Sequence, residues 1–158
     1  MDRKIFYLTK EKLKGLKKEY DQLIILEHNK IVGQEAPKIL ESEDLNPEFV
    51  SFQEDIVFLR SRIEELKNIL GHCELIRKPQ KEKQDFVSLG AKVRIEVAGR
   101  NDEFTITGTL EANPNLGKIS NESPVGKALL GHKIGDAITI SSPIKTTYII
   151  KDIKYEMS

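Results

Sequence analysis

The chain has 158 residues and carries 25 basic residues (Lys and Arg) against 25 acidic ones, so its formal net charge is zero. Charged residues make up 32% and hydrophobic residues 39% of the sequence, and no run approaches the roughly 18 apolar residues of a membrane-spanning helix. These figures exclude a membrane protein and a disordered acidic tail, and zero net charge argues against a protein that coats nucleic acid by bulk electrostatics. Residues 1–5 lack the apolar stretch of a secretion signal, and Cys73 is the single cysteine, so we expect a cytoplasmic protein without disulfides.

The charge is distributed unevenly along the chain. The balance of basic over acidic residues is +3 in residues 1–34, −6 in residues 35–55, +3 in residues 56–83 and zero in residues 84–158. This profile is symmetric about residue 45. If the chain folds back there, its two basic segments meet at one end and the acidic residues gather at the other.

A long helix is predicted from Thr9, its expected N-cap, to about Lys30. Gly33 weakens the helical pattern and Pro37 would remove a backbone hydrogen bond, so we expect the helix to end or kink between them. Its apolar stripe consists of Leu13, Leu16, Tyr20, Leu23, Ile24 and Ile31.

Residues 48–75 show the clearest periodicity in the sequence, because apolar side chains recur every 3.5 residues on average, the spacing of a left-handed coiled coil. Asn46 and Pro47 fit the N-cap and the first position of this second helix. A short turn cannot join parallel neighbours, so an antiparallel hairpin is expected, and a pair of exposed helices that dimerise is the alternative. The predicted seam is Phe52, Ile56, Leu59, Ile63, Leu66, Leu70 and Cys73.

Beyond the polar residues 77–84, the period of the apolar pattern changes from 3.5 to 2. This change predicts a linker followed by a small sheet. One short helix is expected within the sheet domain, with Ser123 as its N-cap, Pro124 at its first position and Gly131 at its end. The predicted strands contain residues 93–97, 104–108, 138–140 and 146–155.

The sequence therefore predicts an α+β protein. Residues 1–76 form an antiparallel coiled-coil hairpin whose tip lies at about 38–49, residues 77–84 form the linker, and residues 85–158 form a small antiparallel sheet domain with one short helix. About 75 residues are just enough for such a domain to support its own core.

Three segments resemble the Gre-type bacterial transcription elongation (transcript cleavage) factors, the GreA/GreB group. Residues 119–131 (ISNESPVGKALLG) with Gly135 and Asp136 resemble the family signature of the C-terminal domain, and residues 87–93 (VSLGAKV) are similar to the start of its first strand. Near the start, residues 7–11 (YLTKE) and 13–23 resemble the family's first coiled-coil helix. The resemblance covers essentially the whole chain and implies an FKBP-like fold for the C-terminal domain.

The resemblance also implies a function. Factors of this family dock their globular domain outside RNA polymerase and insert the hairpin through the secondary channel, and carboxylates at the tip help to hold Mg²⁺ and a water. The polymerase then cleaves the 3′ end of backtracked nascent RNA. Accordingly, the expected partners are RNA polymerase and the nascent RNA 3′ end within the complex, with no membrane contact. Mg²⁺ would be held jointly with the polymerase and not stably by this chain alone. The chain would be a cytoplasmic monomer and not itself an enzyme.

The tip is where the sequence departs from the family. The typical family tip reads approximately GDLKENAEY, whereas residues 43–49 read EDLNPEF, and Pro47 occupies the place of the second functional acid. By resemblance, Asp44 carries over as the metal-binding and cleavage-assisting carboxylate. Glu48 and Glu43 are the candidates for the second acid.

A second group of candidate residues precedes the short helix. In the family this region contacts the polymerase, so the resemblance assigns polymerase binding to Ser123 and Pro124, and also to Asn121 and Glu122. Helix capping alone is the simpler interpretation of Ser123 and Pro124.

The sequence leaves two alternative functions open. The altered tip favours a Gre-like regulator that enters the channel and modulates or inhibits the polymerase without stimulating cleavage. Prolyl isomerisation, known for other FKBP-like domains, would need a deep pocket lined by aromatic side chains, and the second half offers Phe86, Phe104, Tyr148 and Tyr155. Basic residues of the hairpin (Lys14, Lys17, Lys18, Arg60 and Arg62) are most simply its solvated flanks. The separation of His28, His72 and His132 argues against a zinc site.

Overall fold

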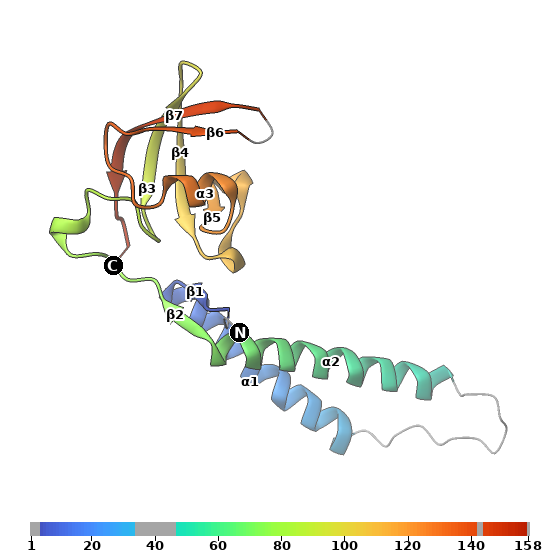
Figure 1. The fold of residues 1–158 in the computed structure, drawn as a ribbon. Helices are drawn as coiled ribbons and strands as arrows, with labels where there is room; N and C mark the ends of the chain where they lie inside the picture. The colour runs from blue at the N-terminus through green and yellow to red at the C-terminus, as the bar shows by residue number, and fades with distance from the viewer. Residues whose placement is uncertain (1–3, 34–46, 142–143, 158) are drawn as a thin grey trace. The chain divides into compact units, whose positions relative to one another are not determined.

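The computed structural model describes residues 4–33, 47–141 and 144–157 (Figure 1). Two compact units divide the chain, one made of Met1–Lys12 with Cys73–Ser158 and the other of Leu13–His72. The first contains the sheets, and we call it the sheet unit; the second contains most of two long helices, and we call it the hairpin. The boundaries expected from the sequence follow periodicity, whereas this division follows contacts in space.

The hairpin consists of α1 (Lys10–Gly33) and α2 (Pro47–Gly71). Thr9 caps α1 as expected, because its Oγ1 accepts a hydrogen bond from the Lys12 amide at 3.2 Å. The helices are antiparallel, since Lys30 near the end of α1 pairs with Asp55 near the start of α2. The predicted cap Asn46 and the predicted end of the first helix between Gly33 and Pro37 involve residues 34–46, which lie outside the described part of the chain.

The predicted seam of α2 is confirmed for most of its length and wrong at its end. Its buried side chains end with Ile69, whereas Leu70 is only half-buried. The helix stops at Gly71, and Cys73 lies in a strand and not on the seam. Glycine is a poor helix former, and a straight helix drifts away from a strict heptad pattern, which accounts for both differences. The buried core residues of the two helices are Leu16, Ile56, Leu59, Ile63, Leu66 and Ile69.

Two short parallel strands escape sequence analysis. β1 (Phe6–Leu8) and β2 (Cys73–Leu75) lie side by side, and the Leu8 carbonyl also accepts a hydrogen bond from the Ile76 amide at 2.8 Å (Figure 1). Leu8 is completely buried. A three-residue strand is too short to show an alternating pattern, so nothing in the local sequence predicts this pairing.

The main sheet has five strands in the order β5-β4-β3-β7-β6. Its neighbours are antiparallel except for β4 and β5, so the predicted antiparallel sheet is correct for four strands and gains a parallel edge strand that the sequence did not predict. The strands are β3 (Lys92–Val97), β4 (Arg100–Thr107), β5 (Lys118–Ser120), β6 (Ala137–Ile140) and β7 (Thr146–Lys154).

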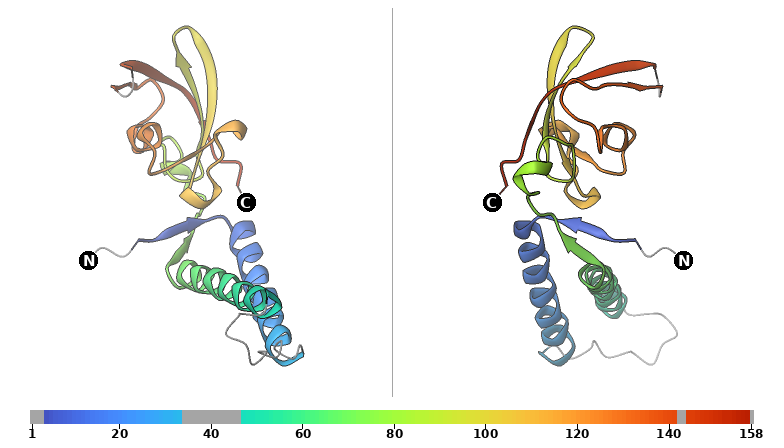
Figure 2. Two further views of the ribbon diagram at one scale, coloured as in Figure 1. Left: turned by 90° about the vertical axis from the view of Figure 1, so that its right-hand side faces the viewer. Right: turned by 60° about the vertical axis from the view of Figure 1, so that its left-hand side comes forward.

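A single short helix, α3 (Pro124–Leu129), packs against the sheet (Figure 2). It begins after Ser123 and at Pro124, as the sequence predicts. Leu129 enters the core beside Val93, Ile95, Ile106 and Ile150, all of them completely buried. The described part of the sheet unit also contains the short 3₁₀ turns η1 (Lys81–Lys83), within the predicted linker, η2 (Thr109–Glu111) and η3 (Pro114–Leu116).

Candidate functional site

The four residues that the resemblance assigns to polymerase binding are consecutive: residues 121–123 form the turn between β5 and α3, and Pro124 is the first residue of α3. We call residues 121–124 the docking loop. The Ser123 hydroxyl donates a hydrogen bond to the Ser120 carbonyl at 2.6 Å and accepts one from the Gly126 amide at 3.1 Å. Capping by Ser123 is thus confirmed, and it fixes the direction in which the loop enters α3.

Close packing at Gly126 holds the loop against β5. A Cβ atom added at Gly126 would collide with the Ser120 carbonyl oxygen, so only glycine lets the first turn of α3 approach the strand this closely. The Asn121 amide donates to the Thr107 carbonyl at 2.9 Å, which ties the loop to β4 as well. The docking loop is therefore a rigid feature that presents the exposed Glu122 and Pro124 to solvent.

Glu122 is oriented by neighbouring hydroxyl groups. Its amide donates to Ser120 Oγ at 3.0 Å, and its carboxylate accepts a hydrogen bond from Thr109 Oγ1 at 2.9 Å. Lys4 Nζ lies 3.9 Å from the same carboxylate. The loop thus carries a positioned negative charge beside the exposed proline ring.

The second candidate site, the hairpin tip, lies mostly outside the described residues. Asp44 and Glu43 lie in the part of the chain that the structure does not describe, and their roles stay predictions. Glu48 is exposed in the first turn of α2, directly after Pro47, which begins the helix. Within the described ranges 4–33, 47–141 and 144–157, no three His, Cys, Asp or Glu side chains gather as metal ligands. That finding covers His28, His72 and His132, and it does not extend to residues 34–46 of the tip region.

Two of the basic hairpin residues bind acids of the opposite helix. Arg62 makes a two-pronged ion pair with Glu19, at 2.8 Å from Nε and 3.1 Å from Nη2, and a third contact with Glu65 at 3.1 Å. The hydrogen bond to Glu19 is the main reason that the pKa of the Arg62 guanidinium is raised. Arg60 contacts Glu27 at 3.3 Å. These arginines hold the two helices in register, which supports their interpretation as flanks of the coiled coil.

The loop after α3 contains an acid–histidine pair that sequence analysis did not single out. Asp136 Oδ2 accepts a hydrogen bond from the Lys133 amide at 3.0 Å and lies 3.1 Å from His132 Nδ1. The amide of Lys133, and after it His132, lowers the pKa of the Asp136 carboxyl. These two contacts close the turn after α3, which gives the pair a structural role.

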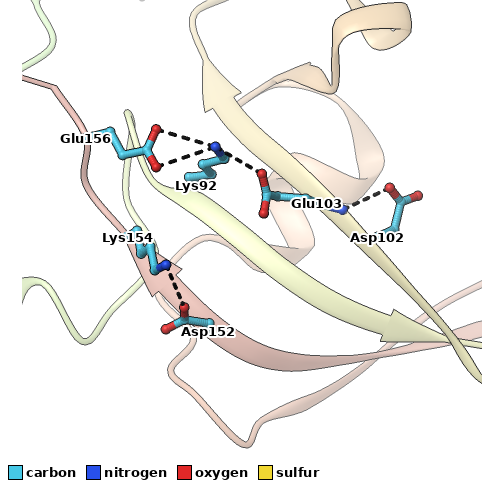
Figure 3. A network of polar contacts seen from close by, with 6 residues as sticks. All are labelled: Lys92, Asp102, Glu103, Asp152, Lys154 and Glu156. Atoms are coloured by element: carbon cyan, nitrogen blue, oxygen red, sulfur yellow. Dashed lines mark hydrogen bonds and ion pairs between the residues drawn. The ribbon is translucent and has the colours of Figure 1, made fainter.

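Charged side chains of β3, β4 and β7, together with Glu156, form polar contacts on the sheet (Figure 3). Lys92 lies between Glu103, at 3.1 Å, and Glu156, at 3.4 Å, and these two carboxylates, Glu103 first, raise the pKa of its ammonium. Lys154 contacts Asp152 at 3.8 Å. Neighbouring carboxylates therefore balance Lys92 and Lys154, so these two lysines offer no concentrated positive potential to a ligand.

Three of the four aromatic candidates of the second half belong to the sheet core or pack against it, namely Phe104, Tyr148 and Tyr155, whereas Phe86 is exposed. Tyr155 is buried and its hydroxyl binds the Phe86 carbonyl and the Ser88 amide, so it has a structural role. A shallow pocket of the sheet unit is lined by residues that include Gly90, Thr105 and Met157, and by none of the four aromatic candidates.

The start of α1 is fixed by a contact that sequence analysis missed. The Glu111 carboxylate accepts hydrogen bonds from the Thr9 amide, at 2.9 Å, and from the Thr9 hydroxyl, at 2.6 Å. The two residues are 102 positions apart in the sequence, so no local pattern predicts the contact.

No helix in the described part of the chain combines the length and apolar character needed to span a membrane.

Comparisons with known proteins agree with the resemblance seen in the sequence. The family model described as "Transcription elongation factor, GreA/GreB, C-term" matches residues 81–155. A transcription elongation factor GreA from Thermomicrobium roseum is 37% identical over 145 residues, covering 90% of this chain and 92% of the relative. GreA from Geobacillus kaustophilus is 37% identical over 147 residues, covering 90% and 91%. Among solved structures, GreA factor homolog 1 (Gfh1) of Thermus thermophilus is 22% identical and covers 96% of this chain and 99% of that chain with a TM-score of 0.42.

Proposed function

The chain belongs to the GreA/GreB family of transcription elongation factors, and on this premise we propose that it binds RNA polymerase, inserts its hairpin through the secondary channel and stimulates cleavage of backtracked RNA. The observation that carries the proposal is the 37% identity to GreA over 90% of the chain. In this proposal the polymerase is the enzyme, and this chain contributes ligands and position. We further propose that the chain acts as a monomer in the cytoplasm, together with the polymerase.

The docking loop is the proposed attachment point on the polymerase. Ser123 caps α3 and thereby fixes the backbone that carries Pro124 and Glu122. An exposed proline ring beside an oriented carboxylate suits a partner surface that combines an apolar contact with a basic group. Asn121 supports the loop through the hydrogen bond from its amide to the Thr107 carbonyl. Asn121 and Ser123 are half-buried, whereas Glu122 is exposed.

The tip is the proposed contribution to cleavage. Asp44, with Glu48 or Glu43, would hold Mg²⁺ jointly with carboxylates of the polymerase, since this hard cation prefers carboxylate and water oxygens. The residue types present fit that ion, because three acids lie within residues 43–48. When bound, such an ion would activate the attacking water and stabilise the leaving oxygen at the RNA 3′ end.

A second function is favoured by one structural observation. Pro47 begins α2. By the resemblance it stands where the family carries its second acid, so this position would offer a helix start and no carboxylate. A factor with a single effective acid would occupy the channel and modulate or inhibit the polymerase without stimulating cleavage.

RNA cleavage in purified, backtracked polymerase complexes distinguishes the two functions. We expect the wild-type chain to accelerate cleavage and Asp44→Asn to lose most of the acceleration while still binding. Asp21→Asn, which removes an exposed aspartate of α1, is the matched control and should behave like wild type. Binding of the wild-type chain without acceleration would establish the regulator instead. Absence of binding would contradict both proposals.

A further inference from the structure

The Thr9 hydroxyl group makes two hydrogen bonds at once. It accepts the Lys12 amide as the N-cap of α1 and donates to Glu111 in η2. Its own amide donates to the second carboxylate oxygen of Glu111. The Glu111 carboxylate therefore holds Thr9 in the orientation in which it caps the helix, and it places a negative charge at the positive end of the helix dipole.

The strand that leads into Thr9 is held by close packing against the same turn. A Cβ atom added at Gly108, which precedes η2, would collide with the Tyr7 carbonyl oxygen. Gly108 is buried, and Glu111 and Thr9 are half-buried. Partial burial strengthens the two charge-assisted hydrogen bonds, since water competes less for the carboxylate.

The same turn contacts the docking loop. Thr109, the first residue of η2, donates to the Glu122 carboxylate and lies 2.9 Å from Ser120 Oγ. Three consecutive residues, Thr109–Glu111, thus connect the docking loop at one end with the start of α1 at the other. All of these contacts lie within the sheet unit, to which residues up to Lys12 belong.

We infer that Glu111 is a positioning residue, which fixes the first turn of α1 to the turn that also supports the docking loop. The inference rests on the proposed function, in which the loop binds the polymerase and α1 leads to the tip. It assigns to Glu111 an effect on what the bound factor achieves, and not on how tightly it binds, because its carboxylate is bound to Thr9 and not to the loop.

Conservative substitutions separate this role from general stability. Glu111→Gln keeps the shape of the side chain but replaces one acceptor oxygen with an NH₂ group that cannot accept the Thr9 amide or hydroxyl. Thr9→Val removes the hydroxyl, whereas Thr9→Ser retains it. Glu103→Gln is the matched control, because Glu103 is a half-exposed acid of the same unit that contacts Lys92 at 3.1 Å.

Hydrogen exchange of the free protein tests the first part of the inference. We expect the Thr9 and Lys12 amides to exchange about five- to tenfold faster in Glu111→Gln, the range expected for loss of one capping interaction. Thr9→Val should speed exchange of the Lys12 amide to a similar degree. Amides of the central strands β3 and β4 should be unchanged in both variants, which shows that the fold is intact. Unchanged exchange at Thr9 and Lys12 in Glu111→Gln overturns the inference.

Titration of the factor against backtracked polymerase tests the second part. Glu111→Gln and Thr9→Val should lower the maximal effect severalfold at saturating factor, with the half-saturating concentration changed less than twofold. Glu103→Gln and Thr9→Ser should match wild type. Faster exchange combined with an unchanged maximal effect would overturn the positioning role. If the wild-type chain binds without accelerating cleavage, the proposed cleavage function fails, and maximal inhibition of RNA synthesis becomes the readout for the same variants.

Discussion

At the scale of single residues, Asp136 shows how a loop is held by one carboxylate. It accepts the Lys133 amide within the turn after α3 and lies beside His132. Both partners favour the charged form, so the pKa of Asp136 is lowered in the folded protein. A group with a lowered folded pKa stabilises the protein above its unfolded pKa, and this contribution disappears as the pH falls through the folded value.

We therefore expect acid to destabilise the wild-type protein more steeply than Asp136→Asn. The difference in melting temperature should be constant above about pH 5 and shrink as the pH falls below about 4, because the unfolded carboxyl titrates near pH 4. Thermal unfolding of both proteins from about pH 2 to about pH 7 measures this difference in melting temperature. Asp85→Asn controls for the loss of a surface charge. Parallel curves for the wild type and Asp136→Asn throughout that range would contradict the expectation.

At the scale of elements, ion pairs between α1 and α2 select one register of the hairpin. The strongest by geometry joins Arg62 and Glu19 through two nearly parallel hydrogen bonds. Both side chains are about one-third exposed, at 34% and 38%, so water weakens the pair only in part. Arg60, by contrast, is 61% exposed and makes one longer contact with Glu27.

A double-mutant cycle on the hairpin should reveal this difference. Arg62→Met and Glu19→Gln should show a coupling free energy of about 1 kcal/mol, because two-pronged pairs exceed the usual worth of a surface pair. Arg60→Met and Glu27→Gln should couple by less than about 0.5 kcal/mol. Thermal unfolding at low and high salt is the measurement. Equal coupling in the two cycles would show that the geometry of the Arg62 pair adds nothing.

At the scale of the whole molecule, the proposed polymerase binding and the proposed effect on cleavage belong to regions far apart in the sequence. The docking loop presents Pro124 and Glu122 on the sheet unit. The proposed tip acids are Glu48, in the first turn of α2, and Asp44, which lies outside the described residues. The first region should set how tightly the factor binds the polymerase. The second should set what the bound factor does.

Kinetics of the cleavage reaction can separate these contributions. Pro124→Ala should raise the half-saturating factor concentration about tenfold, the effect of losing one well-packed interface contact, and leave the maximal rate unchanged. Asp44→Asn should lower the maximal rate and leave the half-saturating concentration unchanged. A loss of maximal rate in Pro124→Ala, with unchanged affinity, would contradict the assignment of the loop to binding. Circular dichroism of Pro124→Ala checks that α3 survives the substitution.

Much of the fold could be predicted because its signals are local. The heptad pattern identifies α2, Thr9 and Ser123 mark helix starts, and alternation identifies the long strands. Local patterns fail in short elements, such as β1, β2 and β5 with three residues each. They also fail where a single residue ends an element: α2 ends at Gly71, before the end of the predicted seam. In such segments long-range pairing outweighs local preference.

By itself, then, the sequence determined the helices, the main antiparallel sheet and the family, because periodicity, capping and signature residues are properties of neighbours along the chain. It also placed the docking-loop residues together, since they are consecutive. Only the tertiary structure decided that the residues before Leu13 join the second half of the chain, and that Glu111 binds Thr9. Those contacts join groups about a hundred residues apart in the sequence, so folding alone brings them together. Beside them Leu8 is buried and the Tyr7 carbonyl packs against Gly108, which has no side chain.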